Sequence, residues 1–280
     1  MIENLRNILV ALTERLGDET PSSALAYGLS LAEGAQARVT VQAVSLRLVL
    51  PHPWISRFVA MVVAAENRRL QSLAQEVVER ARGDASAAGI LCTPLAEHLT
   101  YDDLLASVTG QARIHDLAVV DAEPEVLAGS RGVIETLLFE SGRPVIVVPR
   151  GCEAAARRRI LVAWDGSAQA ARALHDALPL LVRAEHVEIV AVAGEKDLSR
   201  SVPGAEVAPG LAHHGVPVTV TNLPVGDGDV AGTLRRHVTA MGADLIVMGG
   251  YVHSPLREMV LGGTTREMLR SSPVPLLMAH

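Results

Sequence analysis

The chain of 280 residues repeats one pattern of apolar segments, and this internal repeat constrains its fold more than any other feature. Three segments of the first half return in the same order in the second half. The pairs are Asn7–Leu12 with Arg159–Trp164, Asp116–Val120 with Asp244–Met248, and Arg143–Val148 with Val274–Ala279. The repeat predicts two related domains, residues 1–150 and 158–280, joined by a linker at 151–157.

Within each copy, short apolar runs rich in β-branched residues alternate with segments of helical periodicity. Apolar runs without alternation are typical of parallel strands that are buried on both faces. In the second copy, the predicted strands are 160–164, 187–192, 216–223, 245–248 and 274–278, and helices are predicted to begin near Ser167, Asp229 and Thr264. The fold class is therefore α/β, with two tandem, doubly wound, five-stranded parallel sheets in Rossmann-like three-layer sandwiches.

Two corresponding segments are predicted to differ between the copies. Residues 194–215 of the second copy, interrupted by Pro203 and Pro209, should be mostly loop. The first copy carries an insertion there, with a long helix predicted over 54–81. An apolar stripe on this helix consists of Trp54, Ile55, Phe58, Met61 and Val62. We interpret the stripe as packing over its own sheet, and a surface for a partner is the alternative.

Composition disfavours several classes of protein. Apolar residues make up 49% of the chain and charged residues 20%, which suits buried cores and argues against disorder. A net charge of -6 and an aromatic content of 2% disfavour binding to nucleic acid. Cys92 and Cys152 alone suit neither a disulfide framework nor a zinc site, and no apolar run reaches the ~18 residues that span a bilayer. We expect a cytoplasmic protein without nucleic-acid or membrane partners.

Ligands of open parallel sheets bind beyond the carboxyl ends of the strands, where the strand order reverses. In the second copy, this rule points to Asp165 after the first strand, to Val192 near the end of the second, and to the loop after the fourth. Candidate phosphate contacts in that loop are Gly249, Val252, His253, Gly262, Gly263, Thr264 and Thr265. Glycines permit close approach, and the amides of a helix N-terminus favour an anion. The same residues are equally typical of turns and helix caps, so spacing alone leaves both interpretations open.

The repeat, the segment Ile160–Ser167 and the loop Gly249–Thr265 resemble the universal stress protein family over essentially the whole chain. The resemblance implies cytoplasmic α/β domains, dimers, and tandem halves that fold against each other. One branch of the family binds ATP through a loop with three glycines followed by Ser or Thr. By this resemblance, Gly249 matches the first glycine and Gly262 the third, while Asp165 and Val192 match the acidic and apolar contacts.

Two positions depart from the ATP-binding pattern. Val252 stands where the second glycine belongs, and its side chain adds bulk and restricts the backbone, so it should narrow the phosphate cradle. Gly263 stands where Ser or Thr belongs, but its amide can still donate, and Thr264 or Thr265 can supply a hydroxyl. His253 could also hydrogen-bond a phosphate. Binding of ATP with Mg²⁺, or of another adenine nucleotide, is therefore predicted to be weakened in the second domain.

The first copy departs further from the nucleotide-binding pattern. Residues 12–14 replace the Asp-Gly-Ser turn, and the acidic segment Asp121–Glu125 replaces the first glycines. Its carboxylates would repel a triphosphate, which leaves only residues 129–132 as a remnant of the cradle. The first domain is therefore predicted to be a degenerate site that binds no nucleotide.

The leading functional hypothesis is a stress-response binding protein whose second domain takes an adenine nucleotide. The alternative is a protein-interaction scaffold in which both sites are vestigial. No catalytic residues are predicted, because neither a Gly-x4-Gly-Lys-Ser/Thr loop nor a placed general base is present in the sequence. A slow ATPase activity stays open, and an adenylating enzyme is disfavoured because no Ser-Gly-Gly-x-Asp loop follows the first strand.

Ser167 and two adjacent histidines give weaker signals. Ser167 is predicted to cap a helix and not to act as a nucleophile, since a Gly-x-Ser-x-Gly elbow is lacking. The adjacent His213 and His214 lack the spacing of metal ligands, so no metal site is predicted.

From the resemblance, we expect the two halves to pair through contact between Val145–Val148 and Leu276–Met278, and a homodimer is a further expected assembly.

Overall fold

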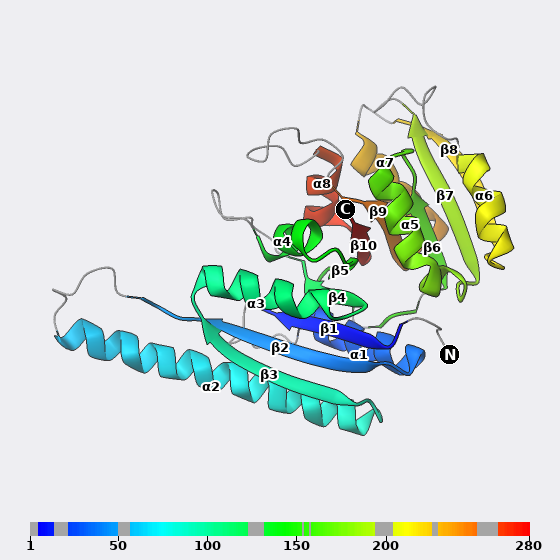
Figure 1. The fold of residues 1–280 in the computed structure, drawn as a ribbon. Helices are drawn as coiled ribbons and strands as arrows, with labels where there is room; N and C mark the ends of the chain where they lie inside the picture. Colours follow the sequence, from blue (N-terminus) through cyan, green and yellow to red (C-terminus); the bar gives the residue numbers. More distant parts are fainter. Residues whose placement is uncertain are drawn as a thin grey trace.

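The computed structural model describes residues 5–13, 22–49, 57–122, 132–152, 154–156, 158–193, 204–225, 229–250 and 263–280. The first half contains β1 (Asn7–Leu12), α1 (Ser23–Ala35), β2 (Arg38–Leu46), α2 (Arg57–Ala87), β3 (Cys92–Leu99), α3 (Tyr101–Arg113), β4 (Leu117–Asp121), α4 (Val133–Glu140) and β5 (Val145–Val148). The second half contains β6 (Arg159–Ala163), α5 (Ala168–Leu181), β7 (His186–Ala193), α6 (Gly204–His213), β8 (Val218–Pro224), α7 (Val230–Met241), β9 (Leu245–Gly249), α8 (Gly263–Ser271) and β10 (Leu276–Ala279). Strands and helices alternate through both halves, as the repeat predicts (Figure 1).

The strands form one ten-stranded sheet in the order β3-β2-β1-β4-β5-β10-β9-β6-β7-β8. Neighbouring strands are parallel within each half. In each half, the first strand lies between the second and the fourth, so β1 lies between β2 and β4, and β6 between β7 and β9. The strand order therefore reverses beside β1 and beside β6, which is where doubly wound sheets bind their ligands.

The two halves join through β5 and β10, which are the one antiparallel pair in the sheet order. Facing residues are Val147 and Leu276, Ile146 and Leu277, and Val145 and Met278. This register confirms the predicted contact between the last strands of the two copies. All six side chains are at most 1% exposed. The junction is therefore part of the hydrophobic core. Burying each side chain of this size contributes about 1.5–3 kcal/mol to the stability of the fold.

Helices cover both faces of the sheet and make three layers (Figure 1). Helices α1, α2, α5 and α6 pack on one face, with buried contacts that include Leu31, Val78, Leu180 and Leu211. Helices α3, α4, α7 and α8 pack on the other face, with contacts that include Leu104, Leu137, Leu234 and Met268. The central strands are buried on both faces, which explains why their sequences read as continuous apolar runs.

The loop prediction for residues 194–215 is wrong over residues 204–213, which form α6. Pro209 lies inside this helix, where it removes one backbone hydrogen bond. The helix is held by packing, because Leu211 is only 3% exposed. Gly204 brings the start of α6 close to the sheet, since an added Cβ would lie 3.0 Å from Cγ2 of Ile189. Burial against the sheet thus outweighs the cost of the proline.

The predicted insertion helix is confirmed as α2, but its apolar stripe does not pack over the sheet. Phe58, Met61 and Val62 are 74%, 69% and 52% exposed, so the packing interpretation is wrong for these residues. The helix is buried only further along, through Ala74, Val78, Ala81 and Ala85. Trp54 and Ile55 lie outside the described residues. The first turns of α2 therefore present apolar side chains to the surroundings.

Candidate functional site

The carboxyl ends of β6, β7 and β9 meet at one edge of the second half. Ala163, the last residue of β6, pairs with Val190 of β7 and with Met248 of β9. Because these strands are parallel, the residues just beyond this register lie at the same edge. They are Asp165, Val192 and Gly249. The register therefore places three of the sequence-predicted site residues together, beside the point where the strand order reverses.

The turn between β6 and α5 positions Asp165. Gly166 has a φ of 74°, a left-handed conformation that glycine adopts without steric cost. An Asp165 carboxylate oxygen accepts a hydrogen bond from the N–H of Ser167 at 2.9 Å. Ser167 Oγ in turn accepts one from the N–H of Ala170 at 3.1 Å. Ser167 is thus the N-cap of α5, which confirms the prediction that it caps a helix.

Gly249 ends β9 where the strand passes the first turn of α5. An added Cβ would lie 2.6 Å from the backbone nitrogen of Ala170 and 2.8 Å from the carbonyl carbon of Gln169. Real Cβ atoms do not approach backbone atoms so closely, so this position requires glycine for packing. The glycine that the sequence suggests for approach to phosphate therefore has a structural role between strand and helix.

The start of α8 supplies the next predicted contacts. Gly263 is the first residue of the helix, is exposed, and has open space around the position of an added Cβ. Thr264 is half-buried and Thr265 is 6% exposed. The first amides of a helix have no acceptor within it and favour an anion. Val252, His253 and Gly262 of the same predicted loop lie outside the described residues.

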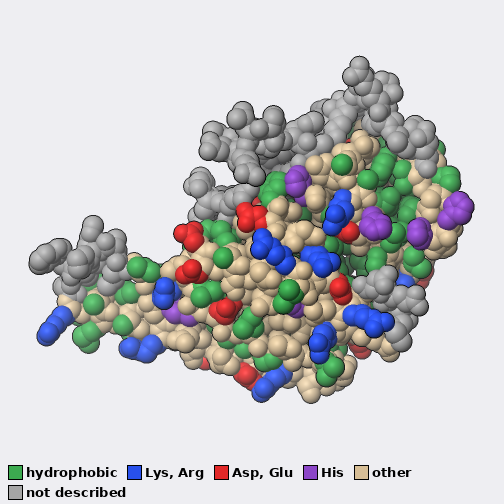
Figure 2. Space-filling model, in the orientation of Figure 1, with side chains coloured by type: hydrophobic (Ala, Val, Ile, Leu, Met, Phe, Trp, Pro, Cys, Tyr) green, Lys and Arg blue, Asp and Glu red, His purple; other side chains and the backbone are tan. Residues whose placement is uncertain are grey.

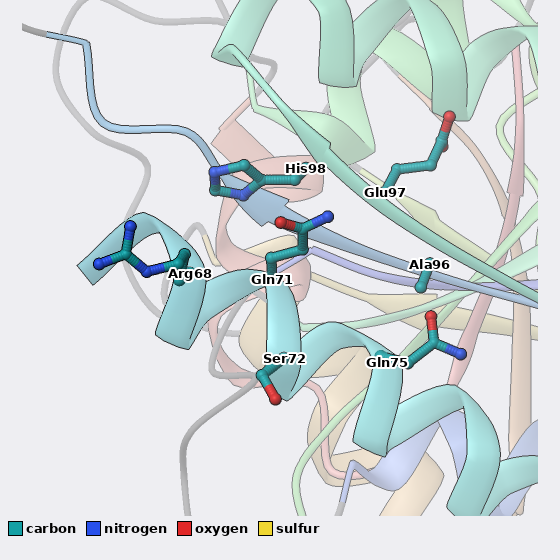
Figure 3. Close-up of a pocket in the computed structure, with 7 residues that line it drawn as sticks. All are labelled: Arg68, Gln71, Ser72, Gln75, Ala96, Glu97 and His98. Atoms are coloured by element: carbon teal, nitrogen blue, oxygen red, sulfur yellow. The ribbon is translucent and has the colours of Figure 1, made fainter. Parts of the chain in front are cut away.

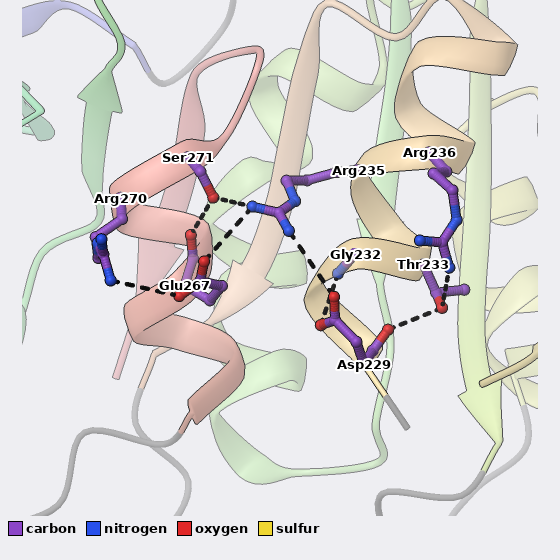
Figure 4. A network of polar contacts seen from close by, with 8 residues as sticks. All are labelled: Asp229, Gly232, Thr233, Arg235, Arg236, Glu267, Arg270 and Ser271. Atoms are coloured by element: carbon purple, nitrogen blue, oxygen red, sulfur yellow. Dashed lines mark hydrogen bonds and ion pairs between the residues drawn. The ribbon is translucent and has the colours of Figure 1, made fainter. Parts of the chain in front are cut away.

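A polar network fixes α8 against α7 (Figure 4). Arg235 of α7 donates to Ser271 Oγ and lies 3.7 Å from the Glu267 carboxylate, both on α8. The same guanidinium lies 3.8 Å from Asp229, whose carboxylate caps α7 by accepting from Gly232 N–H at 2.9 Å. One arginine thus links the start of α7 to the end of α8 and supports the helix whose first turn belongs to the candidate site.

In the first half, a carboxylate fills the corresponding place. Asp121, the last residue of β4, accepts hydrogen bonds from Ser22 Oγ at 2.6 Å and from the N–H of Ala24 at 2.9 Å. Ser22 is the N-cap of α1, so Asp121 lies at the N-terminus of that helix. Sequence reasoning interpreted Asp121 only as a charge that repels phosphate. The signal in the sequence was the polar residue Asp121 at the end of β4. The corresponding strand of the second half, β9, ends in Gly249.

A polar cavity of about 360 Å³ lies between α2 and β3, away from the predicted site (Figure 3). Its lining residues are Arg68, Gln71, Ser72, Gln75, Ala96, Glu97 and His98. His98 Nδ1 lies 2.9 Å from Ser45 Oγ, and burial, aided by the nearby Arg47, lowers the pKa of His98. This shift favours the neutral imidazole. None of the sequence-predicted site residues lines this cavity.

The described histidines belong to no cluster of metal-ligating side chains. Within the part of the chain that the structure describes, no group of three or more His, Cys, Asp or Glu side chains could hold a metal ion. His213 Nδ1 lies 2.7 Å from the carbonyl oxygen of Pro209, at the last turn of α6. That contact gives this histidine a role at a helix end, where unpaired carbonyl groups need partners.

Comparison with known proteins agrees with the fold. The solved structure of a universal stress protein from Archaeoglobus fulgidus is 20% identical, with 97% of each chain covered and a TM-score of 0.70. PA1789 of Pseudomonas aeruginosa, whose structure was solved as a protein of unknown function, is 15% identical, with 99% of this chain and 93% of that chain covered and a TM-score of 0.53. At these identities, the likeness concerns the fold.

Sequence comparison identifies the family. The universal stress protein Slr1230 of Synechocystis is 26% identical over 165 residues, which is 54% of this chain and 56% of that protein. The chain therefore matches little more than half the length of this relative. A model of the universal stress protein family matches residues 156–280, the half that contains the candidate site. The second half of the chain, residues 156–280, therefore belongs to the universal stress protein family.

Proposed function

We propose that the second half of this universal stress protein binds an adenine nucleotide, either ATP with Mg²⁺ or a related compound, as a regulatory ligand. The observation that carries the proposal is the register of β6, β7 and β9, which gathers Asp165, Val192 and Gly249 at the edge where the strand order reverses. Binding of the nucleotide at this edge would signal the metabolic state of the cell to the partners of the protein.

The chemistry of these residues suits the parts of a nucleotide. The Asp165 carboxylate can accept a hydrogen bond from a ribose hydroxyl or a base amine, and Val192 offers an apolar contact for the base. The first turn of α8, from Gly263 to Thr265, offers amides and hydroxyls to phosphate. Open space beside Gly263 leaves room for the phosphate to approach. Mg²⁺ would be carried by the phosphates, as is usual for this ion.

The remaining contacts of the proposal come from the sequence. Gly262 would add a backbone amide to the phosphate cradle, and His253 a hydrogen-bonding ring nitrogen. Val252 replaces a glycine and should reduce the affinity, because its side chain takes up space that the phosphate needs. We therefore expect binding that requires ATP at high micromolar to millimolar concentration, and not the tight binding of a dedicated ATPase.

A thermal-shift titration of the full chain with Mg-ATP tests the proposal. A ligand that binds only the folded protein raises its melting temperature, and at about ten times Kd the stabilisation reaches about 1.4 kcal/mol. Asp165→Ala should remove the shift. A wild-type protein that shows no shift with millimolar ATP would contradict the proposal and favour the scaffold alternative.

A second variant separates loss of binding from loss of folding. Gly263→Val places its side chain in open space, so the fold should persist while the cradle is blocked. Gly110→Val in α3 is the matched control, since an added Cβ there also meets no neighbour within 4 Å. We expect Gly263→Val to lose the ATP-dependent shift and Gly110→Val to keep it, with calorimetric titration as the direct check. Equal shifts in both variants would remove α8 from the proposed site.

A further inference from the structure

Exposed apolar side chains gather at one end of the first half. Seven large residues there are between 40% and 74% exposed, and we call them the α2 tip: Leu46, Leu48, Val49, Phe58, Val59, Met61 and Val62. They come from the end of β2 and the first turns of α2, which project beyond the body of the molecule (Figure 1). Soluble monomers rarely expose apolar side chains in such a group, so the tip indicates a contact surface.

The apolar character is confined to the start of α2. Residues 18 positions apart on a helix, or about five turns, lie on the same face. On the outward face, Phe58 is followed after that interval by Glu76, and Met61 by Glu79. The same face of one continuous helix is thus apolar at its beginning and polar further along, where Glu79 pairs with Arg82. This contrast is not explained by packing, because both parts of the face are accessible to solvent.

A side chain of α2 satisfies the backbone of Leu48 in the tip. The side-chain amide of Asn67 in α2 donates to the carbonyl oxygen of Leu48 at 3.0 Å and accepts from the N–H of Leu48 at 2.8 Å. These two bonds attach the extended chain after β2 to the helix. A surface that enters an apolar environment must satisfy its backbone polar groups internally, and Asn67 does this for Leu48.

Basic side chains surround the tip (Figure 2). Arg47, Arg57 and Arg68 are exposed, and no ion pair is recorded for them within the described ranges. Arg69 lies 3.1 Å from Glu66, so that pair is neutral as a whole. The chain carries a net charge of -6, which makes a basic surface here a local reversal of sign. An anionic partner would therefore be attracted to this end of the molecule.

We propose that the α2 tip binds the surface of an anionic phospholipid bilayer. The seven side chains of the tip offer no hydrogen-bonding group of their own, whereas a protein interface carries about one hydrogen bond per 100–200 Å². An apolar group ringed by arginines is the pattern of a peripheral membrane contact, because apolar side chains enter the headgroup boundary while guanidinium groups meet anionic lipid heads. Asp102 and Asp103 lie in the first turn of α3, which follows Leu99, the partner of Leu46 in the sheet, and α3 packs on the opposite face of the sheet from α2.

This contact differs from a membrane span. None of the helices in the described ranges is both long and apolar enough to cross a bilayer. The expectation of no membrane partner rested on the lack of an apolar run long enough to span a bilayer. The lack of such a run does not bear on attachment of the folded protein to a membrane surface. Peripheral attachment needs only exposed apolar area and a favourable charge, and both are present at the α2 tip.

Vesicle co-sedimentation of the full chain tests the proposal. Wild-type protein should pellet with vesicles of phosphatidylcholine containing about 30% phosphatidylserine, and much less with phosphatidylcholine alone. The double variant Phe58→Ser and Met61→Ser should bind about tenfold more weakly. Its matched control is Leu91→Ser with Ile114→Ser, since these residues are 72% and 68% exposed but lie away from the tip. The control should pellet like the wild type.

The electrostatic part has its own variant. Arg57→Gln with Arg68→Gln should weaken binding to the anionic vesicles, and added salt should do the same in the wild-type protein. Failure of the wild type to pellet, or equal pelleting of the Phe58 and Met61 variant, overturns the proposal. Light scattering tests the alternative that a second copy of the chain covers the tip. If the wild type is a dimer that the same serine substitutions convert to a monomer, and vesicles are not bound, the tip joins two copies and the lipid proposal fails.

Discussion

The last residue of the fourth strand differs between the two halves, Asp121 in β4 and Gly249 in β9, while the helix that starts beside it has a serine cap in both halves. Ser22 caps α1 by accepting from Leu25 N–H at 3.0 Å, and Ser167 caps α5 by accepting from Ala170 N–H at 3.1 Å. In the first half, the Asp121 carboxylate reaches the start of the helix. In the second half, the backbone of Gly249 itself lies against it.

This difference shows how one scaffold can lose or keep a ligand edge. A helix N-terminus attracts negative charge, and the first half supplies that charge from its own chain through Asp121. An anionic nucleotide at this edge would be repelled by the carboxylate. The second half has no side chain at the same strand position, since glycine ends β9. The difference is consistent with the proposal of a site in the second half only, and both positions can be tested.

The largest effect is expected for Gly249→Ala. The new methyl group would lie 2.6 Å from the backbone nitrogen of Ala170, and backbone atoms cannot move aside as a flexible side chain can. We expect a loss of about 3 kcal/mol in the free energy of unfolding, measured by urea denaturation. Gly263→Ala serves as control, because its Cβ has open space, and should change stability by less than about 0.5 kcal/mol. Similar losses in both variants would refute the packing role of Gly249.

A smaller loss is expected for Asp121→Ala. The substitution removes the acceptor for Ser22 Oγ and for Ala24 N–H at the start of α1. We expect unfolding in urea to show a loss of about 1–2 kcal/mol, the usual cost of losing a helix cap or a charged hydrogen bond. Asp121→Asn keeps an acceptor oxygen and should recover most of this loss. If Asp121→Ala were as stable as the wild type, the carboxylate would not be holding the helix.

Much of the fold could be predicted because it follows from local pattern. Strands such as β6 are buried on both faces and therefore read as apolar runs, and Ser167 stands at a spacing typical of a helix cap. The pairing of β5 with β10 came from the resemblance, and burial of both strands agrees with it. The proposed nucleotide residues were found by the rule for strand ends, which depends only on strand order.

The features that sequence reasoning missed depend on contacts between distant residues. Asp121 and Ser22 are 99 positions apart, so no local pattern shows that the carboxylate reaches the helix. Pro209 signalled a loop, but burial of Leu211 against the sheet outweighs that signal. Phe58 and Met61 lie on a face that the sheet does not reach, and helical periodicity cannot show where a sheet ends. These are tertiary effects, which override local propensity.

The smallest effect concerns a buried residue that also differs between the halves. Thr40 of β2 pairs with Leu9, and Glu188 of β7 pairs with the corresponding Leu161. Thr40 Oγ1 lies 2.8 Å from His115 Nε2, whereas a Glu188 carboxylate oxygen lies 3.0 Å from His237 Nε2 and also accepts from Thr221. The second half thus carries a buried charge where the first half carries a hydroxyl.

Acid unfolding of Glu188→Gln examines this charge. Burial opposes the carboxylate, but the hydrogen bonds from Thr221 and His237 outweigh it, so the pKa of Glu188 is lowered. A lowered folded-state pKa stabilises the protein above the unfolded value of about 4.3, and this contribution is lost as pH falls through the folded value. Between pH 7 and pH 3, the free energy of unfolding should therefore fall less steeply for Glu188→Gln than for the wild type. Urea denaturation at each pH should show a difference of about 1 kcal/mol at most. Glu185→Gln, whose side chain is 69% exposed, is the control and should follow the wild-type profile. If Glu188→Gln lost stability in acid as the wild type does, the buried charge of the second half would contribute nothing to its pH dependence.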